Sequence, residues 1–180
     1  MVTNDLRLEH QAILSMLDIL DTMRVRLEGS QIVELDDLRF TIRFLSGFVD
    51  TCHHAKEELA LFPALQALPG TAYEDRIAEL VAEHVRARDL VTRMSRSIED
   101  GQLHTSSFLE AAGSYVTLLR EHLRKEDYTL FPAADIDVPE STAVAVRAEY
   151  ERIEDEQIGP GVHEELHRKL HILVEKYGAS

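Results

Sequence analysis

The chain has 180 residues, enough for one domain with a sizeable core, and its 44 % apolar and 29 % charged residues are typical of a globular protein. A formal charge of −14 disfavours nucleic acid and anionic membranes as partners. The single cysteine, Cys52, excludes an intramolecular disulfide and a cysteine-based metal cage, so we expect a reducing, cytoplasmic location. We expect neither a signal peptide nor a membrane span, because no stretch is long and apolar enough for either.

Helical segments are marked by apolar residues that recur every three to four positions, without the alternation typical of strands. Clusters of Gly, Pro, Ser and Asp separate these segments. We therefore expect no strands, and long helices over residues 4–28, 34–67, 72–99 and 107–130. After an expected loop at 132–139, two shorter helices are predicted over 140–157 and 161–177.

Local signals refine these boundaries. Pro63 lies inside the second predicted helix and should kink it or shorten its last turns. Thr71 with Glu74, and Ser107 with Glu110, form capping-box patterns, which predict where the third and fourth helices begin.

Four long helices with short connections predict an all-α fold, an antiparallel up-down four-helix bundle. We expect residues 1–135 to form this bundle and residues 136–180 to form one or two additional C-terminal helices packed on it. Phe40, Phe44 and Phe48 recur at helical spacing and are expected in the core.

A weak internal repeat runs through the four predicted helices. A histidine on one helix is followed on the next by His-x-x-x-Glu and then by Leu-Phe-Pro, and this order occurs twice. Two similar halves place these groups about a pseudo-twofold axis. The repeated polar residues are His10, His53, Glu57, His84, His122 and Glu126.

Helix geometry predicts that these side chains meet. Residues i and i+4 lie on one face, about 5–6 Å apart at their Cβ atoms, so His-x-x-x-Glu aims an imidazole and a carboxylate at one interior point. Imidazole suits iron, and a carboxylate can bridge two cations. Because two buried glutamates are costly unless cations compensate them, the repeat predicts a dimetal site with four histidine and two glutamate ligands.

The histidine doublet leaves two registers open on the second helix. The residue four before His53 is apolar, whereas the residue four before His54 is acidic and continues a polar stripe. We therefore choose His53 with Glu57 as ligands, and His54 with Glu58 stays the alternative. Lys56 and Glu58 are expected on the solvated face, and the neighbouring cysteine in the core.

Over about residues 5–132, the sequence resembles the hemerythrin HHE cation-binding family, whose motif pieces appear here in order on helices. The resemblance implies a four-helix bundle with a non-haem centre of two iron ions, which we expect to share an oxo or hydroxo bridge. It also implies that the two glutamates bridge the irons. By analogy, His10 and His53 would serve mainly one iron, and His84 and His122 the other.

The sequence departs from the pattern of the oxygen-carrying hemerythrins. Arg88 stands where those proteins have a second histidine on the third helix, and the last carboxylate is Glu126, four residues after its histidine, rather than an aspartate five residues on. This resembles the branch associated with iron sensing, peroxide or nitric oxide chemistry and iron handling. We expect O2, peroxide or nitric oxide to bind at open coordination positions, with catalase-like turnover of peroxide as one reaction.

Two further functions stay open. In one, the protein is an iron or oxygen sensor, and a partner protein reads the order that iron imposes on the bundle. In the other, it stores or donates iron. His and Glu ligands alone do not separate iron from manganese or zinc, and the oligomeric state is left open as well.

The C-terminal segment carries three histidines, His163, His167 and His171, at spacings of four. The first two match the zinc-protease pattern H-E-x-x-H, but few residues follow for a third ligand and no supporting sheet is expected. We interpret this stripe as a packed or exposed helix face. The alternative is that one of the three joins the iron site. Tyr128 and Tyr150 are further candidates for neighbours of the site.

Overall fold

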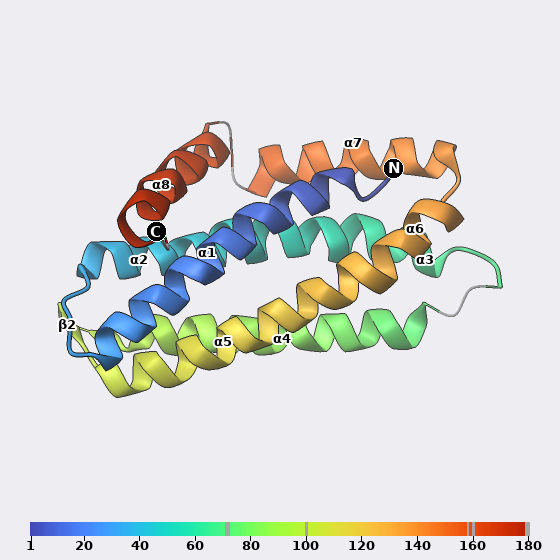
Figure 1. Ribbon diagram of the computed structural model, residues 1–180. Coiled ribbons are helices and arrows are strands. Elements are labelled where there is room, and N and C mark those ends of the chain that lie inside the picture. The colour runs from blue at the N-terminus through green and yellow to red at the C-terminus, as the bar shows by residue number, and fades with distance from the viewer. Residues whose placement is uncertain (71–72, 100, 158, 160, 179–180) are drawn as a thin grey trace.

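The computed structural model describes residues 1–70, 73–99, 101–157, 159 and 161–178, and for His163 and Glu164 the backbone only. Four long helical rods lie side by side (Figure 1). The first and third rods are α1 (Asn4–Glu28) and α4 (Glu74–Arg96). The second joins α2 (Leu35–Phe44), η1 (Leu45–His54), η2 (Glu57–Leu61) and α3 (Phe62–Gln66). The fourth joins α5 (Thr105–Lys125), η3 (Glu126–Leu130) and α6 (Phe131–Asp137).

Two further helices cover the bundle. Helix α7 (Glu140–Gln157) packs on η1 and η2, and α8 (Val162–Tyr177) packs on α1 (Figure 1). None of the helices in the described part of the chain is long and apolar enough to cross a membrane.

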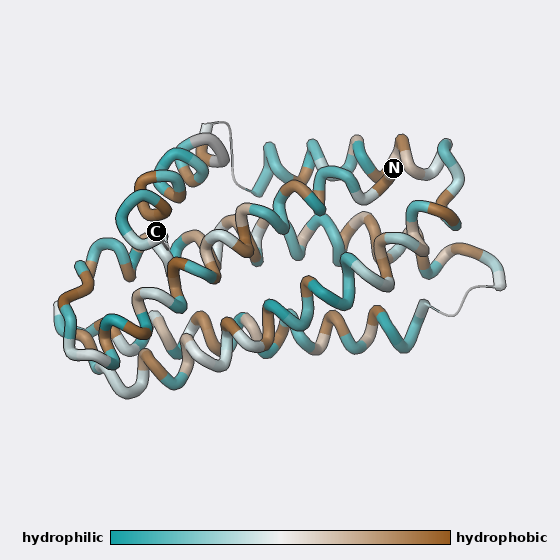
Figure 2. Tube along the Cα trace, in the orientation of Figure 1, coloured by the Kyte–Doolittle hydropathy of each residue, from teal (hydrophilic) through white to brown (hydrophobic). Residues whose placement is uncertain are grey.

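Apolar periodicity accounts for the rods. Along α1, for example, Leu6, Ile13, Leu17 and Leu20 are completely buried at helical spacing. Figure 2 shows brown apolar and teal polar positions recurring along every rod. The three phenylalanines expected in the core, and Cys52 beside them, are buried as predicted.

The second and fourth rods become π-helical at corresponding places. The segments η2 and η3 each begin at a glutamate of the repeat and end directly before Phe-Pro. Proline has no N–H and its ring crowds the preceding turn, and the wider π turn accommodates both. Pro63 therefore does not break its helix, which continues through α3 to Gln66. The same arrangement at Pro132 carries α6 to Asp137, so the loop predicted at 132–139 is wrong.

Three smaller expectations also need correction. Helix α5 begins at Thr105 and has no side-chain cap, so the capping box of Ser107 with Glu110 is wrong. The box at Thr71 lies outside the described residues. The expectation of no strands fails at one tight turn, where β1 (Ile98–Glu99) pairs with β2 (Gln102–Leu103) in antiparallel register.

A polar layer divides the interior. One apolar cluster is built mainly from residues 12–49 and 87–123, and a second from residues 2–6, 60–80 and 130–153. The histidines of the repeat lie between these clusters in sequence on the first three rods, and on the fourth rod His122 lies one residue before Leu123, where the first cluster ends. Helix α8 contributes to the first cluster through Leu170 and Leu173, and α7 contributes to the second through Val146 and Tyr150. The tail therefore completes both apolar layers on either side of the polar one.

Candidate metal centre

The structure brings the six polar residues of the repeat together in the middle of the bundle. Each is at most 2 % exposed, and they come from all four rods. They form two overlapping groups in which one donor atom per residue lies within 4.8 Å of the others. One group holds His10 and His53, the other holds His84 and His122, and both contain Glu57 and Glu126. Two sites that share two carboxylates have the composition of a dimetal centre.

Distances within each group suit a metal. The Nε2 atoms of His10 and His53 are 3.2 Å apart, and those of His84 and His122 are 3.0 Å apart. Two metal–nitrogen bonds of about 2.1 Å at a right angle would place the nitrogens about 3 Å apart. The carboxylate oxygens of Glu126 lie 3.4 Å from His10 Nε2 and 3.2 Å from His122 Nε2. Nitrogen and oxygen donors therefore point at common centres.

The two shared carboxylates show whether the residues at the centre suit a metal ion. All four carboxylate oxygens of Glu57 and Glu126 are buried without a hydrogen-bond partner among the described residues. Burial and the charge of Glu126 raise the pKa of Glu57 well above its usual value. Burial also opposes ionisation of Glu126, yet the charges of His122 and His10 hold its pKa well below its usual value. Such a pair is costly inside a protein unless cations compensate it, and metal ions fit that demand.

Protons balance part of this charge when no metal is bound. Burial acts to lower the pKa of His10, but the hydrogen bond with Asp127 and the charge of Glu126 raise it to about 9. Burial likewise opposes protonation of His122, and the charge of Glu126 raises its pKa to about 9. Metal binding at these nitrogens therefore competes with protons.

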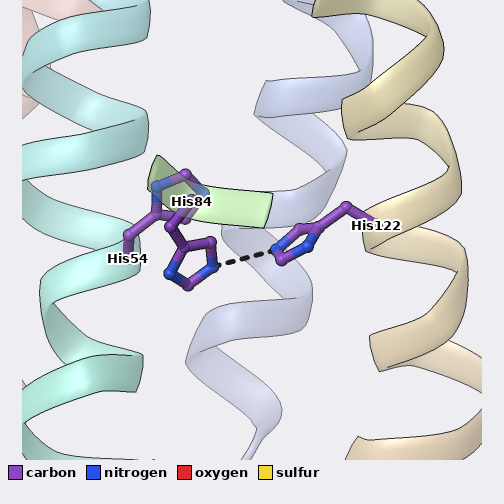
Figure 3. A group of neighbouring side chains, drawn as sticks. All are labelled: His54, His84 and His122. Carbon is purple, nitrogen blue, oxygen red and sulfur yellow. Dashed lines mark hydrogen bonds between the residues drawn. The ribbon is translucent and has the colours of Figure 1, made fainter. Parts of the chain in front are cut away.

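His54 is the residue that sequence reasoning placed wrongly. It is 1 % exposed rather than on a polar face, and its ring stacks on that of His84 with centroids 3.8 Å apart. His54, His84 and His122 form a third group of converging donors (Figure 3). The Nε2 atom of His54 is buried with no hydrogen-bond partner among the described residues, and burial, together with the nearby imidazole of His84, lowers the pKa of His54 well below the usual value. A neutral imidazole with an unpaired nitrogen is suited to bind metal.

The π-helical backbone explains why both members of the doublet point inward. In η1 the turn is closed by i→i+5 bonds, so neighbouring residues are separated by a smaller angle than in an α-helix. His53 and His54 therefore both face the centre, one in each group. A 3.6-residue period makes them alternative ligands, but in the π-helix both can be ligands together. Arg88, in the place of the missing histidine on α4, binds Asp50 and Glu58 instead. A doublet placed shortly before Leu-Phe-Pro is the signal that could have identified His54.

Two of the four histidines of the repeat form a hydrogen bond through Nδ1, the ring nitrogen that faces away from the centre, with a glutamate that also binds a lysine. His53 Nδ1 lies 2.8 Å from Glu9 Oε2, and Lys56 Nζ donates to Glu9 Oε1 at 2.5 Å. The other half of the repeat copies this arrangement: His122 Nδ1 lies 2.9 Å from Glu83, to which Lys125 donates at 2.6 Å. The expectation that Lys56 is solvated is wrong, because its side chain is 2 % exposed.

The remaining two histidines pair with the residue that follows each shared glutamate. His10 Nδ1 lies 3.0 Å from Asp127, which also binds Arg7. His84 Nδ1 lies 2.7 Å from Glu58, which also binds Arg88. Glu58 is thus half-buried behind an imidazole rather than on a solvated face.

The two glutamates that also bind a lysine, Glu9 and Glu83, stay ionised. Burial acts to raise the pKa of Glu9, but the hydrogen bond with His53 and the charge of Lys56 lower it to about 2. The corresponding bonds with His122 and Lys125 overcome burial and lower the pKa of Glu83 to about 2. An ionised carboxylate accepts a hydrogen bond from Nδ1–H of the imidazole. This bond orients the ring and leaves Nε2 facing the centre, as in carboxylate–histidine–metal arrangements.

Removing one of these carboxylates tests its orienting role. For Glu83→Ala we expect iron affinity to fall by about 10- to 100-fold, because His122 loses the partner of its Nδ1. Glu79→Ala is the matched control, since Glu79 is exposed, contacts the same Lys125 and touches no imidazole. Competition with a chelator gives both affinities, and equal values for the two variants would show that Glu83 does not orient the ring.

The tail histidines and the exposed tyrosine stay outside the cluster. No group of converging donors among the described residues contains His167 or His171. The ring of His167 packs edge-on against Phe48, with centroids 5.4 Å apart, and the side chain of His163 lies outside the described residues. Tyr128 is 76 % exposed, whereas Tyr150 is buried and lines a pocket together with Glu9 and Lys56.

Comparison with known proteins agrees with this geometry. Neither a search of curated proteins nor a search of solved structures returned a match. A scan against protein families matches residues 1–134 to the hemerythrin HHE cation-binding domain. This stretch contains three of the rods, the fourth as far as residue 134 in α6, and every histidine and glutamate of the cluster. The chain belongs to the hemerythrin HHE cation-binding domain family.

Proposed function

We propose that this protein is a non-haem di-iron protein that binds or reacts with a small oxidant, namely O2, peroxide or nitric oxide. The observation that carries the proposal is the pair of donor groups that share Glu57 and Glu126, whose four oxygens have no hydrogen-bond partner among the described residues. Iron, when bound, supplies the redox chemistry, and the chain supplies ligands, orientation and a site largely closed to water.

The donor set makes the two proposed metal positions unequal. His10 and His53 serve one position, whereas His54 joins His84 and His122 at the other. Both positions share the two glutamates. The position with only two imidazoles therefore keeps more room for a small ligand, and we assign ligand binding to it.

We also propose three broader properties of this protein. The four rods form an antiparallel up-down bundle over residues 1–135, with 136–180 as an extension. The protein works in the cytoplasm, in keeping with a single buried cysteine. Peroxide is turned over in a catalase-like reaction in which two molecules of hydrogen peroxide give one O2 and two waters.

Metal analysis of aerobically purified protein tests the proposal. We expect two irons per chain and near-ultraviolet and visible absorption from an iron pair. His53→Ala and His54→Ala should each lose iron, because each imidazole belongs to a different donor group, whereas His171→Ala, an exposed change, should not. A full iron content in both His53→Ala and His54→Ala, or no metal in the unmodified protein, would contradict the proposal. Evolution of O2 from peroxide then tests the catalase-like reaction separately.

A sensor function is the second candidate, because one contact links the centre to the extension. Lys56 donates to Glu9, which holds His53, and also to Glu154 of α7 at 2.7 Å. A change at His53 can therefore reach α7 through one buried lysine. If the protein evolves no O2 from peroxide but proteolysis of α7 slows on iron binding, sensing is favoured.

A further inference from the structure

Tyr150 carries an unpaired hydroxyl deep inside the protein. Six buried side-chain nitrogen and oxygen atoms of the described residues lack a hydrogen-bond partner. Five belong to His54, Glu57 and Glu126, which are donors of the proposed metal centre. The sixth is the hydroxyl oxygen of Tyr150, on a side chain that is 2 % exposed. A buried tyrosine normally finds a partner for its O–H, so this atom points to a group that binds there.

The position of Tyr150 places it on the two-imidazole side of the centre. Helix α7 packs on η1 and η2, which carry His53, His54 and Glu57, so the side of the centre that Tyr150 faces depends on its nearer neighbours. Tyr150 lines a surface pocket of about 390 Å³ together with Glu9 and Lys56, the residues behind His53. Burial raises the pKa of Tyr150, and the carboxylates that add to this effect most are Glu57 and Glu9. Glu58 and Glu83, which bond to Nδ1 of His84 and of His122, do not line that pocket.

We propose that the Tyr150 hydroxyl donates a hydrogen bond to the small ligand held at the His10–His53 position. The inference rests on the proposed function, because it requires a metal at that position. The inference also restricts the kind of ligand, because the ligand atom nearest to the Tyr150 hydroxyl must accept a hydrogen bond. Azide, hydroperoxide and nitric oxide have such an atom.

Tyr150 lies beyond residues 1–134, the stretch that matches the family. The C-terminal extension thus contributes a hydroxyl group at the proposed ligand position, in addition to the apolar residues that it packs on the bundle. Tyr150 is a positioning residue that selects for hydrogen-bond acceptors, and the bundle residues of the family motif do not supply its hydroxyl.

Azide binding to the iron-loaded protein tests the inference. Tyr150→Phe removes the hydroxyl and keeps the ring, and Tyr128→Phe makes the same change on an exposed side chain. We expect all three proteins to carry the same iron per chain. The dissociation constant for azide, read from the azide-to-iron absorption band, should rise about 10-fold or more in Tyr150→Phe and stay unchanged in Tyr128→Phe.

A second readout does not depend on the metal. Without iron, the unpaired hydroxyl has a desolvation cost and no compensating bond, so metal-free Tyr150→Phe should melt at or above the temperature of the metal-free unmodified protein. A lower melting temperature would show that the hydroxyl has a structural partner, and would overturn the inference.

The remaining outcomes separate the inference from the proposed function. Equal azide affinity in all three iron-loaded proteins overturns the role of Tyr150 and leaves the di-iron centre standing. Loss of iron in Tyr150→Phe also overturns it, because the hydroxyl would then support the metal rather than its ligand. If the unmodified protein binds no iron, the proposed function fails and the inference fails with it.

Discussion

Glu126→Ala is expected to abolish binding of both metal ions. Glu126 belongs to both donor groups, and its two oxygens approach His10 on one side and His122 on the other. Removing a shared carboxylate takes a ligand from each position and half of the negative charge that attracts the cations. Iron content per chain, measured after reconstitution and desalting, should fall from two to near zero.

Glu121→Ala is the matched control for this experiment. Glu121 lies on the same rod, one residue before His122, but its side chain is half-exposed, and among the described residues it bonds only to Arg124. The control should retain both irons. Retention of one tightly bound iron in Glu126→Ala would mean that the carboxylate serves a single position and does not bridge.

Removing the metal should lower the melting temperature by about 10 °C. A ligand present at about 1,000 times its dissociation constant stabilises the folded state by about 4 kcal/mol, and for a chain of this size each kcal/mol corresponds to about 2–4 °C. The physical cause is the pair of buried glutamates, whose oxygens have no hydrogen-bond partner among the described residues and which depend on cations for compensation. Calorimetry of the protein with iron and after chelation measures the difference.

The variant Glu57→Gln with Glu126→Gln distinguishes this cause from general effects of iron. Neutral amides fill nearly the same space without the charge, so iron should no longer change the melting temperature. An iron-dependent shift that persists in the variant would place the stabilising metal elsewhere.

Helix boundaries set by local chemistry were readable from the sequence. Apolar periodicity and Gly-Ser or Gly-Pro breaks predicted α1 at 4–28 and α7 at 140–157, and the structure has the same bounds. The loop predicted at 132–139, which begins at Pro132, is wrong, since the π turn η3 lets α6 continue to Asp137. Whether a proline ends a helix depends on the turn before it, and a 3.6-residue pattern does not contain that information.

The repeat of histidine and glutamate was also a sequence-level feature, because i, i+4 spacing defines a face and burial of two acids demands cations. What surrounds these residues depended on tertiary packing. By sequence, His54 continues a polar stripe from Asp50 and Lys56 stands next to Glu57, so both look solvated. The structure nevertheless turns His54 inward on η1 and covers Lys56 with α7.

Tyr150 illustrates the same limit over a longer distance. It lies far along the chain from the ligands, on a helix whose own pattern indicates only that one face is apolar. Local spacing determined which side chains share a helix face, and hence the dimetal hypothesis. Packing between distant segments alone decided that Glu9 pairs with His53 and lines a pocket with Lys56 and Tyr150. Contacts between separate helices depend on how the helices dock and not on spacing along any one of them.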